Sequence, residues 1–133
     1  MSPIIALAAF GLLTMLLITL EIVYIYITQG FAFGFSSNRP ERERTTFGGR
    51  VERVYKNQVE ASAYVVPILG AAAFLGLASP AVQMASLLIV IGRALFAVLY
   101  LTGLPFLRIL GFTMASLSSF YLAIIILLDA ATT

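Results

Sequence analysis

Residues 80–101, PAVQMASLLIVIGRALFAVLYL, decide the fold class of this chain. The run begins with Pro80 and contains one charged residue, Arg93. Proline suits the first turn of a helix, and a helix of about 20 apolar residues crosses the hydrocarbon core of a bilayer. A barrel strand would be about half as long and would alternate apolar with polar residues. We therefore interpret this stretch as a membrane-spanning α-helix.

Three further runs on either side have a similar character. The first of these runs is interrupted only by Glu21. It is longer than the apolar part of a signal peptide and has no basic residues before it, so we interpret it as a retained helix. The four predicted helices cover residues 3–28, 50–77, 80–101 and 105–128. The sequence thus predicts an all-α membrane protein, an up-and-down bundle of four transmembrane helices. We expect a single domain over residues 1–133, with a polar loop at 30–49.

The composition agrees with a lipid environment. Hydrophobic residues make up 61% of the chain, charged residues make up 11%, and the mean hydropathy is +1.03. A soluble domain carries about 25% charged residues. The chain has no cysteine and no histidine, which removes disulfides, thiolate metal ligands and the commonest general base. We expect no metal site and no nucleic-acid partner.

The basic residues gather beside two turns that share one side of an up-and-down bundle. Arg108 lies beside the third turn, and the second turn on the other side is uncharged. The basic residues of the first loop and its flank are Arg39, Arg42, Arg44, Arg50, Arg53 and Lys56. Because positive residues favour the cytoplasmic side, we expect the 30–49 loop to be cytoplasmic and both termini to lie outside. The mixed-charge run at 41–44 is interpreted as solvated loop.

A polar stripe runs along one face of the second predicted helix, at spacings of 3, 4, 3 and 4 residues. Its members are Arg50, Arg53, Asn57, Glu60 and Tyr64. Glu21 and Arg93 place charge at similar depth on two other helices, and Tyr100 shares a face with Arg93. An unpaired charge in the bilayer costs at least about 2.5–3.5 kcal/mol. We therefore expect Arg93 to pair with Glu60 or Glu21, in a polar cavity lined by helices one, two and three.

A second interpretation gives these residues a purely structural role. Buried polar side chains hold membrane helices together, at about 0.6 kcal/mol per contact. For a single residue such as Glu21, the two interpretations are equally good. A stripe on one helix together with Arg93 and Tyr100 favours a binding site, because helix association requires only one or two such groups.

The pattern Arg53-x3-Asn57-x2-Glu60 near the start of a second membrane helix resembles the signature of the MAPEG family, the membrane-associated proteins in eicosanoid and glutathione metabolism. A second block is also similar to that family's third helix and its turn into the fourth. This block comprises Gly92, Arg93, Tyr100, Gly103, Pro105 and Arg108. The resemblance covers essentially the whole chain. It implies a microsomal glutathione transferase-like, bacterial-type member in the inner (cell) membrane.

The resemblance implies a homotrimer that binds glutathione, as cosubstrate, between neighbouring subunits near the cytoplasmic side. Arg108 would be the catalytic residue that stabilises the thiolate. The residues expected to bind glutathione are Arg50, Arg53, Lys56, Asn57, Glu60, Tyr64, Arg93 and Tyr100. Arginine suits the carboxylates of glutathione because it binds carboxylates bidentately. The expected activity is that of a transferase or peroxidase, acting on lipophilic electrophiles or hydroperoxides that enter from the bilayer.

Two other functions remain open. Phe96 stands where members of the family often have His or Tyr, and Phe112 stands where one has Tyr. These departures point to a non-catalytic integral subunit or scaffold of a larger membrane complex. A small transporter or channel using Glu21, Glu60 and Arg93 is the third hypothesis. It ranks last because four short helices show neither broken segments nor inverted repeats.

Overall fold

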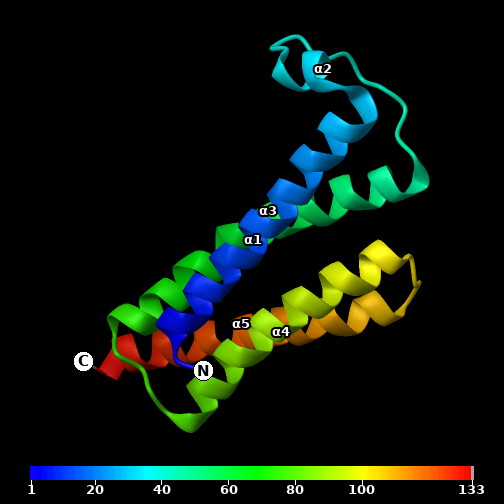
Figure 1. Cartoon of the computed structure of the whole chain (residues 1–133). Coiled ribbons are helices and arrows are strands. Elements are labelled where there is room, and N and C mark those ends of the chain that lie inside the picture. The colour runs from blue at the N-terminus through cyan, green and yellow to red at the C-terminus, as the bar shows by residue number, and fades with distance from the viewer. Residues whose placement is uncertain (133) are drawn as a thin grey trace.

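The computed structural model describes residues 1–132 and consists of helices joined by short segments (Figure 1). The helices are α1 (Pro3–Gln29), α2 (Phe31–Phe35), α3 (Thr46–Phe74), α4 (Pro80–Thr102) and α5 (Leu107–Thr132). No strand occurs within residues 1–132, so the expected all-α class is confirmed for that part of the chain. Helices α1, α4 and α5 are long and apolar enough to cross a membrane. Helix α3, where a fourth span was expected, is more polar because charged side chains occupy its first turns.

The helix ends are set by capping residues. Thr45 precedes α3, and its Oγ1 accepts a hydrogen bond from the Gly48 N–H at 3.0 Å, so α3 begins four residues before the expected Arg50. At the other end, Gly103 follows α4 with a φ of 77°, the left-handed conformation that glycine adopts at helix ends. Within the expected 30–49 loop lies a short helix, α2, which the sequence did not predict.

Helices α4 and α5 pack backbone against backbone. A Cβ atom added to Gly92 would lie 2.7 Å from the carbonyl oxygen of Gly111, and one added to Gly111 would lie 2.6 Å from the backbone nitrogen of Phe96. Small residues permit this approach between membrane helices. Figure 1 shows α4 and α5 as one pair and α1 with α3 as another, with both termini at the same end as the α3–α4 turn.

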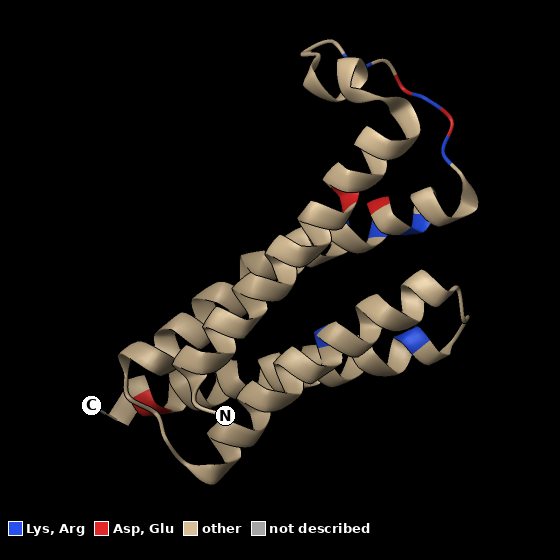
Figure 2. Ribbon diagram, viewed as in Figure 1, with Lys and Arg blue, Asp and Glu red and all other residues tan. Residues whose placement is uncertain are grey.

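An apolar core joins the two pairs at the end that holds the termini. Phe10, Leu69, Ile89 and Leu122 come from four different helices, and each is at most 1% exposed. The outer surface is apolar as well: Met15 is 67% exposed and many other large apolar side chains lie open. Such a surface is expected where apolar side chains face the lipid of a membrane. Figure 2 shows the basic residues gathered in the other half of the molecule, toward α2 and the α4–α5 turn.

Candidate functional site

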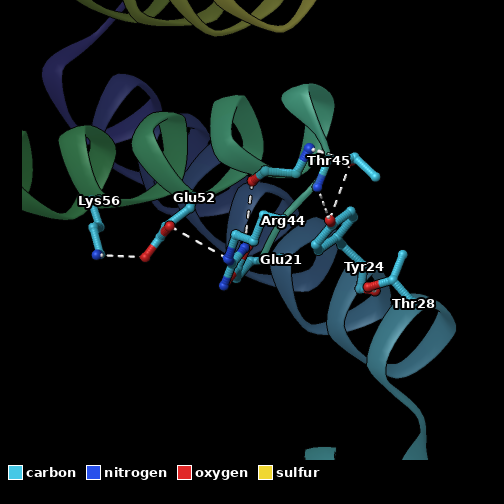
Figure 3. Close-up of polar contacts among 8 residues, drawn as sticks. Glu21, Tyr24, Thr28, Arg44, Thr45, Glu52 and Lys56 are labelled. Carbon is cyan, nitrogen blue, oxygen red and sulfur yellow. Dashed lines mark hydrogen bonds and ion pairs between the residues drawn. The ribbon is translucent and has the colours of Figure 1, made fainter. Parts of the chain in front are cut away.

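A chain of ion pairs links α1, the loop and α3 (Figure 3). The Arg44 guanidinium donates to both oxygens of Glu21, at 2.6 and 2.9 Å. Its Nε lies 3.4 Å from Glu52, which also accepts from the Lys56 ammonium at 2.7 Å. Hydrogen bonding to Glu21 raises the pKa of Arg44 above its usual value, so this loop residue stays charged. Glu21 is therefore neutralised by the loop and not by Arg93, which corrects one of the two expected pairings.

The start of α3 is also fixed to α1 by a tyrosine. The Tyr24 hydroxyl lies 3.2 Å from Thr45 Oγ1 and accepts from the Thr45 backbone N–H at 3.2 Å (Figure 3). A Cβ atom added to Gly48 would overlap the Tyr24 ring and hydroxyl, so a larger residue there would displace this tyrosine. The polar stripe of α3 therefore begins on a helix end that is held in place by both a hydrogen bond and an ion pair.

Arg93 has no carboxylate partner among residues 1–132. It is 1% exposed; its Nε donates to Gln58 Oε1 and one terminal nitrogen donates to Asn57 Oδ1, both at 2.9 Å. The expected pair with Glu60 is therefore also wrong. The physical reason is rotation about the helix axis: Asn57 and Gln58 face α4, whereas Glu60 is exposed. The cation also lies 4.9 Å from the centre of the Phe96 ring.

Two adjoining pockets form a hollow of mixed charged and aromatic lining on α3, which we call the α3–α4 recess. The larger, of about 300 Å³, is lined by Arg53, Lys56, Asn57, Glu60, Phe96 and Tyr100. The smaller, of about 200 Å³, is lined by Asn57, Glu60, Ala61, Tyr64, Arg93 and Phe112. They share Asn57 and Glu60, so seven of the nine residues expected at the site lie along one hollow.

The recess departs from the expected cavity in its walls. Its third helix is α5, through Phe112, and not α1. Glu21 of α1 instead lines a separate pocket of about 620 Å³ beneath the loop, which reaches Arg53 and Lys56 from the other side. The polar residues expected around one cavity between helices one, two and three thus line two separate hollows, and the paired Glu21 and Arg44 both line the one beneath the loop.

Two expected site residues lie outside the recess. Arg50 packs against Gly103 and donates to the Leu101 carbonyl at 3.4 Å, so it holds α3 against the α4–α5 turn. Arg108 lies 4.4 Å from the centre of the Tyr100 ring. Tyr100 lines the recess and Arg108 does not, so the Arg108 charge borders the hollow without lining it.

Within the recess, the two charges of opposite sign that lack partners are Arg53 and Glu60. Neither makes a hydrogen bond or an ion pair with residues 1–132, and both are exposed. Lys56 is exposed too but is paired with Glu52. A zwitterionic ligand that carries an ammonium and carboxylates matches such an arrangement.

Sequence reasoning missed Gln58 and Thr14. Gln58 is 0% exposed; its Oε1 accepts from Arg93 and its Nε2 donates to Thr14 Oγ1 at 2.9 Å. The Thr14 hydroxyl donates in turn to the Phe10 carbonyl at 2.9 Å. The only signal was the presence of an amide one position beyond the stripe and of a hydroxyl inside an apolar run, which alone does not indicate a contact.

An apolar groove of about 500 Å³ adjoins the recess between α3 and α5. Its walls include Tyr64, Ile68, Phe112 and Phe120. Tyr64 and Phe112 also line the smaller pocket of the recess. The recess, with its charged side chains, therefore adjoins a surface suited to an apolar chain.

Two comparisons with known proteins bear on the chain. The family model of the MAPEG family matches residues 4–128. None of the curated proteins matches the chain.

Proposed function

The chain belongs to the MAPEG family, and on that premise we propose that it is a glutathione-dependent membrane transferase or peroxidase acting on lipophilic electrophiles or hydroperoxides. The observation that carries the proposal is the α3–α4 recess. There Arg53 and Glu60, two charges of opposite sign without partners among residues 1–132, lie beside Asn57 and Tyr100.

The recess fits the charges of glutathione, which has two carboxylates and one ammonium. Arg53 and Lys56 would hold the carboxylates, because a guanidinium binds a carboxylate through two parallel hydrogen bonds. Glu60 would hold the ammonium. Asn57 would bind a peptide group, since its side chain lies in both halves of the recess.

Arg108 is proposed as the catalytic residue through its charge. Bound glutathione would supply a thiol, whose ordinary pKa is about 8.5 and whose reactive form is the thiolate. A nearby cation favours the ionised form. Arg108 lies 4.4 Å from the centre of the Tyr100 ring at the border of the recess, where its charge would act on that thiol without blocking the hollow.

The second substrate would lie in the apolar groove between α3 and α5. The groove shares Tyr64 and Phe112 with the recess, so an apolar molecule along it would have one end beside the glutathione. Holding two reactants at neighbouring sites lowers the barrier by removing the entropy of encounter. This arrangement supports a lipophilic acceptor that enters from the bilayer.

The exposed charges of α3 support the homotrimer that we propose for the protein in its membrane. Arg53, Lys56 and Glu60 are exposed in the single chain, and charged side chains that face the hydrocarbon of a bilayer are costly. A neighbouring copy would cover them and complete the site. We further propose a bacterial inner membrane, with the loop end in the cytoplasm and the termini outside.

Thiolate formation provides the test. Purified protein in detergent is mixed with glutathione, and the ultraviolet absorbance of the thiolate is followed for wild type and Arg108→Ala. We expect a saturable thiolate signal in wild type and a smaller one in the variant at equal occupancy. No signal and no binding at saturating glutathione would contradict the proposal.

One observation favours a second function, that of a non-catalytic subunit of a larger membrane complex. Phe96 is 7% exposed and packs on Tyr100 and Phe112, with ring centres 5.5 and 6.0 Å away. These three rings leave Tyr100 as the only hydroxyl among them. Co-purification with other membrane proteins, without affinity for glutathione, would support this alternative.

A further inference from the structure

Arg93 is the least expected charge in the molecule. It lies in the membrane helix α4 with 1% of its surface exposed, and its two hydrogen-bond partners are both neutral amides. A buried charge is an expensive way to join helices, and a neutral side chain would serve that purpose with less desolvation. The hydrogen bonds that it makes indicate what it does.

A guanidinium has only donors, so each partner must turn an acceptor toward it. Asn57 therefore directs Oδ1 at Arg93, at 2.9 Å, and its NH2 group is left for the recess that Asn57 lines. Without Arg93, the two ends of the Asn57 amide would be free to exchange places.

The second arm of the guanidinium leads away from the recess. Arg93 Nε donates to Gln58, Gln58 donates to Thr14, and Thr14 donates to the Phe10 carbonyl, each at 2.9 Å. All three bonds run in one direction, from α4 through α3 to α1. This chain of hydrogen bonds joins helices. Of its residues only Arg93 lines the recess; Gln58, Thr14 and Phe10 do not.

We propose that Arg93 is a positioning residue that acts through Asn57: it presents the amide NH2 group, and not the amide oxygen, to the ligand. The ligand group at this point is then a hydrogen-bond acceptor, and the peptide carbonyl of glutathione has that chemistry. The ligand part of this inference rests on the proposed function, whereas the orientation of Asn57 does not. Arg93 itself need not touch the ligand, in contrast to the role expected from the sequence.

The two arms allow the positioning role to be separated from a structural one. Asn57→Asp keeps an oxygen toward Arg93, and now a charged one, but offers the recess no NH2 group. Gln58→Leu breaks the arm that joins the helices and leaves Asn57 in place. Arg93→Lys keeps the charge, but an ammonium lacks the planar fork that reaches both amides.

The test measures the melting temperature and the glutathione affinity, by calorimetry in detergent, for wild type and the three variants. For Asn57→Asp we expect a melting temperature at or above that of wild type and an affinity at least about tenfold lower, the effect of one lost hydrogen bond. For Gln58→Leu we expect a lower melting temperature with affinity within about twofold of wild type. Arg93→Lys should lose affinity as Asn57→Asp does.

Three results would overturn the inference. A melting temperature of Asn57→Asp well below wild type would show that no acceptor faces Arg93, whether or not glutathione binds. Equal glutathione affinity in Asn57→Asp and wild type would show that the ligand accepts no hydrogen bond from the Asn57 NH2 group. An affinity loss in Gln58→Leu as large as in Arg93→Lys would show that Arg93 has a structural role and does not position Asn57. Wild type that binds no glutathione would instead refute the proposed function and the ligand part, while the melting temperatures still decide the orientation.

Discussion

Replacing either Glu21 or Arg44 by glutamine should destabilise the protein, and the two replacements should cause unequal losses of stability. In Arg44→Gln, the carboxylate of Glu21 stays at a position that is 7% exposed in α1, without a cation. In Glu21→Gln, the amide oxygen still accepts from Arg44, and Arg44 keeps Glu52 at 3.4 Å as a second partner. Arg44→Gln should therefore be the more harmful change.

The magnitudes follow from the geometry. Removing Arg44 strands a carboxylate about eight residues inside a membrane helix, which costs on the order of 2–3 kcal/mol when the value for the bilayer centre is reduced for its shallower depth. Replacing Glu21 by Gln exchanges two hydrogen bonds between charged groups, at 2.6 and 2.9 Å, for a contact of the Arg44 cation with one neutral amide oxygen. That difference is about 1 kcal/mol. The double variant should be more stable than Arg44→Gln alone, because no charge is then stranded.

Thermal unfolding in detergent measures the effect, with about 2–5 °C expected per kcal/mol for a chain of this size. Lys56→Gln is the matched control, since the Lys56–Glu52 pair is exposed at the lysine and exposed pairs contribute little to stability. A Glu21→Gln protein less stable than Arg44→Gln would show that the Glu21 carboxylate is not stranded when Arg44 is removed. So would losses in the double variant that equal the sum of the two single variants.

Three further outcomes follow from the structure. Gly111→Val should destabilise the protein by at least about 1–3 kcal/mol, because its side chain would meet the backbone of α4; thermal unfolding checks this, and an unchanged melting temperature would show that α4 and α5 do not pack so closely. The chain has no cysteine, so a membrane-impermeant thiol reagent should label Ser37→Cys and Ala78→Cys from opposite sides of sealed vesicles; labelling from the same side would contradict the helix arrangement. Arg108→Lys should keep most of the thiolate signal that Arg108→Ala loses, since it retains the charge; equal loss in both variants would make the guanidinium shape, and not its charge, the cause.

The parts of the fold set by local sequence could be predicted, and those set by packing could not. Long apolar runs and the residues Pro80 and Gly103 located the ends of α4 to within about one residue, because helix propensity and capping act locally. Helix α2 was missed because Gly30 and Gly34 indicate a loop. In the structure, Gly34 lies against the Tyr26 ring, and this tertiary contact favours a helical turn.

In the candidate site too, the features set within one helix could be predicted, and those set by packing between helices could not. Helical periodicity alone brought Arg53, Asn57 and Glu60 to one face, and the structure places all three in the recess. The partners of Arg93 depended on the rotation of α3 against α4, which no spacing within one helix reveals. The mixed charges around Arg44 indicate a solvated loop, and nothing in the sequence shows that this loop returns to α1, where Arg44 pairs with Glu21.

In the proposed function, the α3–α4 recess binds glutathione through Arg53 and Glu60. Calorimetric titration of the purified protein in detergent measures this binding, with Arg53→Gln and Glu60→Gln beside wild type. We expect saturable binding by wild type and affinities at least about tenfold lower in each variant, since each removes a charge-assisted hydrogen bond. Wild type that takes up no glutathione, or variants that bind it as tightly as wild type does, would contradict the account.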